Sequence, residues 1–207
     1  MNFQEIPQFI QTGSWICRYS LIKFVKEIED WKNGINTDVK LEMNPDFQRG
    51  HVWTEEQQVL FIESLLKGGA KNAKTIHLNH PNWMRTNNKK YNEFVCVDGL
   101  QRFTAIKNFL DNNLKVFGLL YKNFSGTLRM MHDMFISIND LPTKKDILRW
   151  YIEMNYSGTI HSKEELDRVK TLLAKESLEG KDLIEEEMLE NETNNWLNIR
   201  RNAKYGW

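Results

Sequence analysis

The sequence predicts a protein that mixes short β-strands with α-helices, as an α+β or α/β fold with a helical C-terminal portion. Short runs rich in β-branched and aromatic residues alternate with stretches whose apolar residues recur at helical spacing. The 207 residues, 41% of them hydrophobic, suffice for one well-buried domain with an appendage, or for two small domains.

Four elements are expected in the first third of the chain. Residues 20–33 should form a helix, because their apolar side chains recur every three to four positions and a glycine follows. A short strand at 39–41 then leads into a loop over 43–53, which contains Asn-Pro and a glycine. A second helix over 54–67 begins with a Thr-x-x-Gln capping box and stops at Gly-Gly.

The middle of the chain is expected to supply most of the strands. The β-type runs are 75–78, 91–97, 116–121 and 134–138. The run at 91–97 is followed at once by a helical pattern that begins after Asp98-Gly99.

Two capped helices are expected toward the C-terminus, the first starting at Thr143 and the second at Ser162. An acidic run over 185–192 then precedes a basic stretch over 200–204. We place a domain boundary near Ser157, which divides the chain into residues 1–156 and a helical C-terminal extension, 157–207.

Composition excludes several classes of protein. Lys+Arg and Asp+Glu are both 28, so no overall field draws the chain toward nucleic acid or membrane, and a nucleic-acid surface would have to be a local patch. Cys17 and Cys96 have neither zinc-site spacing nor a disulfide framework, and Cys96 should be a buried thiol. Without a signal-peptide pattern or a long apolar segment, the protein should be soluble, cytoplasmic and free of membrane contact.

The stretch from Val95 to Ile106 holds the first candidate site. A strand that passes through Asp98-Gly99 into a helix exposes N–H groups that lack intrahelical partners, and the helix dipole there favours negative charge. Arg102 adds a planar cation suited to phosphate. Considered alone, an Asp-Gly corner is more typical of a simple turn.

A second polar cluster lies in the loop before the second helix and contains Gln48, Arg49 and His51. Two arginines near a helix N-terminus could clamp a polyphosphate, whereas the Asp98 carboxylate would repel it unless a metal ion bridges them or the acid directs a water. The glutamine amide of Gln101 can orient such a water. Together these groups suit nucleotide binding, with hydrolysis as an option.

The segment from His77 to His80 contains two histidines but does not favour a metal site. Side chains alternate along a strand, so His77 and Asn79 share a face while His80 points away. Too few ligand types therefore converge there.

The two clusters together resemble the N-terminal domain of GmrSD-type restriction enzymes, in the ParB/sulfiredoxin-like superfamily. Residues 44–53 (NPDFQRGHVW) are similar to the family's Pro-x-Tyr-Gln-Arg-x-x-x-Trp element, and 98–106 (DGLQRFTAI) to its Asp-Gly-Gln-Gln-Arg signature. Segments 135–139 and 147–152 resemble the continuation of that pattern. Two departures are Leu100 in place of the first glutamine and Phe47 in place of tyrosine.

The resemblance implies a compact α+β nucleotide-handling fold, with a small mixed sheet flanked by helices, that acts in DNA restriction and anti-phage systems. It implies that Asp98 and Gln101 are catalytic, with Asp98 also supporting Mg²⁺. The residues it assigns to nucleotide binding are Gln48, Arg49, Gly99, Arg102 and Asn139. Full-length relatives carry further helical and nuclease regions, whose DNA cleavage is not transferred to these 207 residues.

Three functions remain open from the sequence. The first is a nucleoside-triphosphate-binding protein, with slow metal-assisted hydrolysis as an option, that acts in phage defence or in phage counter-defence. The second is a ParB-like DNA-binding or regulatory module without turnover. The third is an adaptor whose tail, with Trp196 and Trp207, docks a protein partner or a second copy.

Overall fold

A computed structural model gives the architecture of most of the chain. It describes residues 15–48, 50, 52–70, 73–83, 91–128, 132–157 and 163–179. The strands are β1 (Trp15–Tyr19), β2 (Leu41–Glu42), β3 (Thr75–Asn79), β4 (Phe94–Asp98) and β5 (Met134–Asn139). The helices are α1 (Leu21–Lys32), α2 (Glu55–Leu66), α3 (Leu100–Leu110), the 3-10 turn η3 (Tyr121–Asn123), α4 (Lys144–Ser157) and α5 (Lys163–Glu179).

The strands form one mixed sheet in the order β1-β5-β3-β4-β2. The β1–β5 and β3–β4 pairs are antiparallel, whereas β5–β3 and β4–β2 are parallel. β3 and β4 are consecutive strands and pair antiparallel. β5 joins the sheet on the other side of β3 and runs parallel to it. The expected α+β class, with a small mixed sheet flanked by helices, is confirmed.

Side-chain alternation along β4 divides the interior into two apolar clusters. Phe94 and Cys96 belong to one cluster, whereas Val95 and Val97 belong to the other. All four side chains are buried, which explains why this strand reads as a continuous apolar run. The sheet is therefore covered on both faces at β4.

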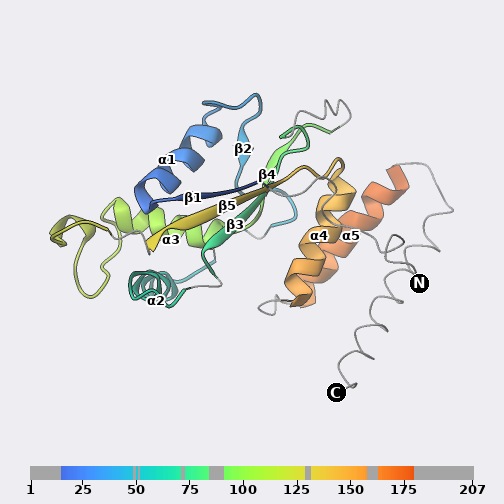
Figure 1. The fold of residues 1–207 in the computed structure, drawn as a ribbon. Helices are drawn as coiled ribbons and strands as arrows, with labels where there is room; N and C mark the ends of the chain where they lie inside the picture. The colour runs from blue at the N-terminus through green and yellow to red at the C-terminus, as the bar shows by residue number, and fades with distance from the viewer. Residues whose placement is uncertain are drawn as a thin grey trace, which may run out of the picture.

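Different helices cover the two faces of the sheet. The larger cluster contains the apolar sides of α1, α2 and α3, and the smaller one contains Ile147, Leu148, Trp150 and Tyr151 of α4 with Val169 of α5. Figure 1 shows the α4–α5 pair set apart from α1, α2 and α3. The helices after residue 143 thus pack on the face of the sheet opposite to α1, α2 and α3.

Local sequence signals fixed several element boundaries as expected. Ser20 is the N-cap of α1, and the capping box of α2 is present, with Gln57 N–H donating to Thr54 Oγ1 and Thr54 N–H donating to Gln57 Oε1. Thr143 precedes α4, and its Oγ1 accepts from the Asp146 N–H. These contacts lie within four residues, so the sequence alone could specify them.

One expected strand is wrong and one strand was not expected. Residues 116–121 form a tight turn instead, in which Val116 and Leu119 make an isolated bridge around left-handed Phe117 and Gly118. The N–H and carbonyl groups of Val116 and Leu119 bond to each other, so these residues are not paired with a strand of the sheet. The missed strand is β1, a five-residue edge strand that depends on pairing with β5.

Some expectations fall on parts of the chain without described structure. Ser162, the acidic run at 185–192 and the basic stretch at 200–204 lie outside the described residues. The boundary near Ser157 stays a prediction. Within the described part of the chain, no helix combines the length and apolarity needed to cross a membrane.

Candidate functional site

The corner between β4 and α3 has the expected path from strand through glycine to helix. β4 ends at Asp98, Gly99 is the N-cap, and α3 begins at Leu100. Gly99 has a φ of +126°, and a Cβ added there would lie 2.3 Å from Ile76 Cγ2 on β3. Only glycine fits this position, because both the backbone angle and the close approach of β3 exclude a side chain.

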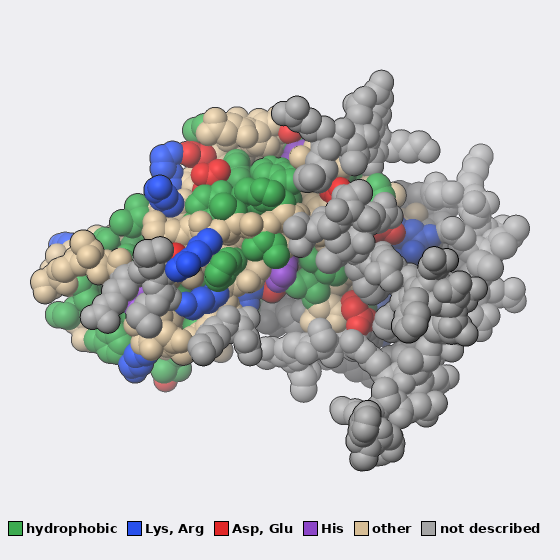
Figure 2. Space-filling model, viewed as in Figure 1, with side chains coloured by type: hydrophobic (Ala, Val, Ile, Leu, Met, Phe, Trp, Pro, Cys, Tyr) green, Lys and Arg blue, Asp and Glu red, His purple; other side chains and the backbone are tan. Residues whose placement is uncertain are grey.

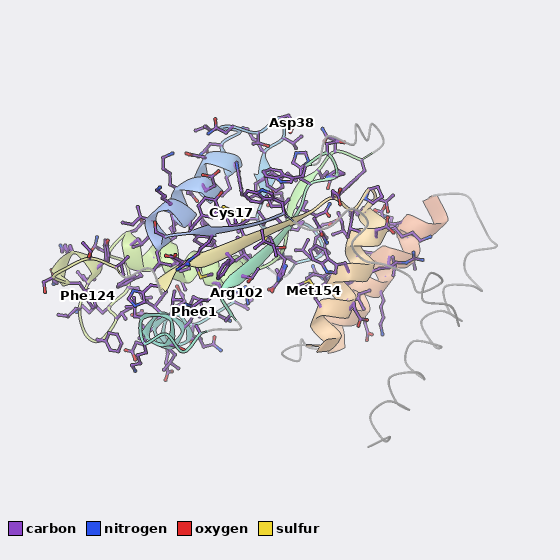
Figure 3. All side chains as sticks on the ribbon, in the orientation of Figure 1. Cys17, Asp38, Phe61, Arg102, Phe124 and Met154 are labelled. Carbon is purple, nitrogen blue, oxygen red and sulfur yellow. The ribbon has the colours of Figure 1, made fainter. Side chains whose placement is uncertain are left out.

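Asp98 and Arg102 form an ion pair across the first turn of α3. Arg102 Nη2 donates to Asp98 Oδ2 at 2.6 Å. The Arg102 side chain is 17% exposed and that of Asp98 is 47% exposed, so the carboxylate faces solvent while the guanidinium lies mostly beneath the surface. In Figure 3 Arg102 is labelled below β3, between α2 and the α4–α5 pair.

The Arg102 guanidinium keeps unused hydrogen-bonding capacity. Its Nε is buried and donates to none of the described residues. A buried N–H group without an acceptor is costly, so the position favours an oxygen ligand.

His77 is a third member of this corner that the sequence analysis did not assign. It lies opposite Asp98 in the β3–β4 register, and its ring meets Trp150 of α4 edge to face, with 5.9 Å between centroids. Burial lowers the pKa of His77, Asp98 raises it and Arg102 lowers it again. The imidazole is therefore neutral at neutral pH, and its buried Nδ1 has no partner among the described residues.

The space-filling view draws the molecule from the same side as Figure 1. Figure 2 shows a histidine and an acidic side chain near one another at the surface on that side. The sequence contained the signal for His77, a histidine on the same strand face as Asn79, but the register with Asp98 depends on a bulge at His77/Leu78.

The two glutamines hold the loop before α2 against this corner. Gln48 Nε2 donates to the Cys96 carbonyl of β4 at 2.6 Å. Gln101 Nε2 donates to the Gly50 carbonyl at 2.7 Å, and its Oε1 accepts from the N–H groups of Val52 and Trp53 at 2.9 and 3.1 Å. Both amides therefore bind the protein backbone, and the assigned parts of Gln48 in nucleotide binding and Gln101 in catalysis stay predictions.

The remaining assigned residues have different placements. Arg49 and His51 lie outside the described residues, between Gln48 and Val52, which the glutamine contacts place beside the corner. Asn139 is buried at the end of β5, where it pairs in register with Asn79. β3 separates it from β4, so the structure does not bring Asn139 together with Asp98 and Arg102, and its role also stays a prediction.

A magnesium ion would fit this corner only with help from a ligand. No three His, Cys, Asp or Glu side chains of the described residues are grouped closely enough to hold a metal ion. Asp98 supplies one half-exposed carboxylate, of which Oδ2 is engaged by Arg102. Because Mg²⁺ commonly binds one or two carboxylates together with substrate phosphates, Asp98 fits as one protein ligand among phosphate oxygens.

Comparison with known proteins identifies the family. Neither the curated proteins nor the solved structures gave a match. A model of the family described as GmrSD restriction endonuclease, N-terminal domain, matches residues 28–205, which include both glutamine-arginine segments and the α4–α5 pair. The chain therefore belongs to the GmrSD restriction endonuclease N-terminal domain family.

Proposed function

We propose that this protein binds a nucleoside triphosphate at the β4–α3 corner. The phosphates would contact Arg102 and the N-terminus of α3, with Gly99 allowing close approach and Gln48 and Arg49 on the neighbouring loop. We also propose that the fold belongs to the ParB/sulfiredoxin-like superfamily. Family membership associates the chain with DNA restriction, and we place its role in phage defence or counter-defence.

The observation that carries this proposal is the prepositioned and mostly buried guanidinium of Arg102. Its Nη2 is held in place by Asp98, while its buried Nε has no acceptor among the described residues. A prepositioned guanidinium at a helix N-terminus, partly exposed, suits a phosphate oxygen, because both the charge and the helix dipole favour an anion.

Asp98 makes the binding depend on a cation. A phosphate that contacts Arg102 would lie close to this carboxylate, which is half exposed and negatively charged. Asp98 is the residue that would hold Mg²⁺, and the ion's charge would offset the repulsion between carboxylate and phosphate. In slow hydrolysis, Asp98 would orient the attacking water, and Gln101 would act on that water or on the loop that faces it.

A thermal-shift experiment with ATP, GTP, CTP and UTP, each with and without Mg²⁺, tests the proposal. At least one nucleotide should raise the Tm of the wild-type protein, more with Mg²⁺ than without, because a ligand that binds only the folded state stabilises it. Arg102→Ala should abolish this shift. Lys107→Ala serves as a control, since Lys107 lies on α3 and pairs with Asp111 away from the corner.

A phosphate-release assay with the same nucleotides measures turnover separately from binding. Asp98→Asn should reduce phosphate release more than nucleotide affinity if Asp98 directs a water. An Arg102→Ala protein that folds normally and keeps the full shift would remove Arg102 from the site. Equal loss of binding and turnover in Asp98→Asn would refute its catalytic role.

A DNA-binding module without turnover is the second candidate, and family membership is the observation that favours it. Because the net charge is zero, DNA would have to contact a local basic patch. Binding should then weaken steeply with salt, since each phosphate contact releases counterions. A gel-shift series from low to physiological salt measures this, and the absence of retardation at low salt would reject the candidate.

A further inference from the structure

The α5 helix contacts the loop that carries the first glutamine-arginine segment. Arg168 Nη2 donates to the carbonyl oxygens of Phe47 and Gln48, at 3.1 and 2.8 Å. These two carbonyls directly precede Arg49 in the chain. A residue 120 positions away therefore fixes the backbone that leads into a proposed phosphate-binding arginine.

A second connection reinforces this contact. Lys144 Nζ, at the start of α4, lies 2.7 Å from Asp46 Oδ2 in the loop and 3.5 Å from Glu176 Oε1 on α5. The Phe47 ring is buried in the smaller apolar cluster, 5.3 Å from the Tyr151 ring centroid. The loop is thus attached to the α4–α5 pair by charge and by packing.

The contacts on the loop come from two independent parts of the molecule. Gln48 and Gln101 join it to β4 and α3, which form the candidate site. Arg168 and Lys144 join it to the α4–α5 pair, which covers the other face of the sheet. The loop therefore connects α5 to the candidate site at Phe47 and Gln48, in addition to the contact between Trp150 of α4 and His77.

We propose that Arg168 is a positioning residue for the nucleotide site, through which α5 sets the conformation of the loop before Arg49. The charged donor holds two consecutive carbonyls, so it limits rotation of the peptide between Phe47 and Gln48. The part of this inference that concerns nucleotide affinity rests on the proposed function, whereas the hold on the loop does not.

Three variants test it. Arg168→Met removes the donors but keeps an unbranched side chain that suits a helix. Arg168→Lys keeps a charged donor at the same place and should rescue the effect in part. Lys175→Met is the control, because Lys175 is an exposed cation two turns further along α5.

Two measurements are made on each full-length protein. Amide hydrogen exchange over residues 44–53, without nucleotide, reports the hold on the loop. The nucleotide Kd with Mg²⁺ reports its consequence. Arg168→Met should speed exchange in that segment and weaken nucleotide binding by at most about tenfold, the full value of a charged hydrogen bond, while Lys175→Met should match wild type.

The outcomes separate the two proposals. Loop exchange and Kd in Arg168→Met equal to those in Lys175→Met would overturn the positioning role. Faster loop exchange in Arg168→Met, together with no nucleotide binding by the wild-type protein, would overturn the proposed function alone. Weaker binding in Arg168→Met that Arg168→Lys restores in part supports both.

Discussion

At the scale of single residues, the space available at the β4–α3 corner restricts which residue can occupy position 99. Gly99 lies where β3 crosses closest to the start of α3, against Ile76. The same crossing brings His77, the next residue of β3, into register with Asp98. The glycine therefore permits the approach that assembles the corner, apart from any contact it makes with a ligand.

Gly99→Ala should lower the free energy of unfolding by about 3 kcal/mol or more, because a clash of 2.3 Å with Ile76 adds to an unfavourable φ. Urea unfolding measures the change. Gly118→Ala is the control, since Gly118 also has a positive φ but its Cβ would meet nothing within 4 Å. That variant should lose only about 1 kcal/mol, and an equal loss in both would show that the approach of β3 is not limiting.

At the scale of elements, the loop at 43–53 is ordered by long-range contacts more than by its own sequence. The Gln101 amide alone makes three hydrogen bonds to its backbone, from the first turn of α3. These bonds satisfy Gly50, Val52 and Trp53 at the approach to α2. Gln101, for which the family resemblance predicts a catalytic role, thus has a structural role in this loop.

Gln101→Met should cost about 1 to 3 kcal/mol of unfolding free energy, because it removes three hydrogen bonds while keeping the side-chain length. Hydrogen exchange of the amides of Val52 and Trp53 should rise in the same variant. Gln57→Met provides the comparison, since Gln57 Oε1 accepts a single bond in the capping box of α2. A loss in Gln101→Met no larger than that in Gln57→Met, with loop exchange unchanged in Gln101→Met, would show that the loop contacts of Gln101 are energetically unimportant.

At the scale of the whole molecule, the sheet separates two apolar clusters, and Cys96 is buried in the larger one. Burial raises the pKa of this thiol from 9.0 to about 12. Burial also raises the pKa values of Tyr19 and Tyr91. All three groups must lose their protons more readily in the unfolded chain than in the folded protein.

The free energy of unfolding should therefore fall as pH rises from about 9 toward 12, with the stability from Cys96 fully present below 9. In that window the unfolded thiol is ionised and the folded one is not, so this group contributes a slope of about 1.4 kcal/mol per pH unit. Denaturant titrations at several alkaline pH values measure it. Cys96→Ala retains both tyrosines and should show a shallower slope, and an unchanged slope would contradict the burial of the thiol.

The sequence alone determined the features that depend on neighbours along the chain. The cap at Ser20, the capping box at Thr54 and the passage through Gly99 into α3 each involve contacts within a few residues. The α+β class follows from the same short-range periodicities. The family could also be inferred, because its two signatures are contiguous stretches of residues.

Only the tertiary structure decided which distant residues meet. It placed His77 opposite Asp98 through a bulge, directed the amides of Gln48 and Gln101 to the protein backbone, and joined Arg168 to the loop before Arg49. It also left Asn139 beside Asn79, apart from the corner, and turned residues 116–121 back on themselves. Strand register and helix packing set these contacts, and both arise from the burial of whole faces, which no local pattern contains.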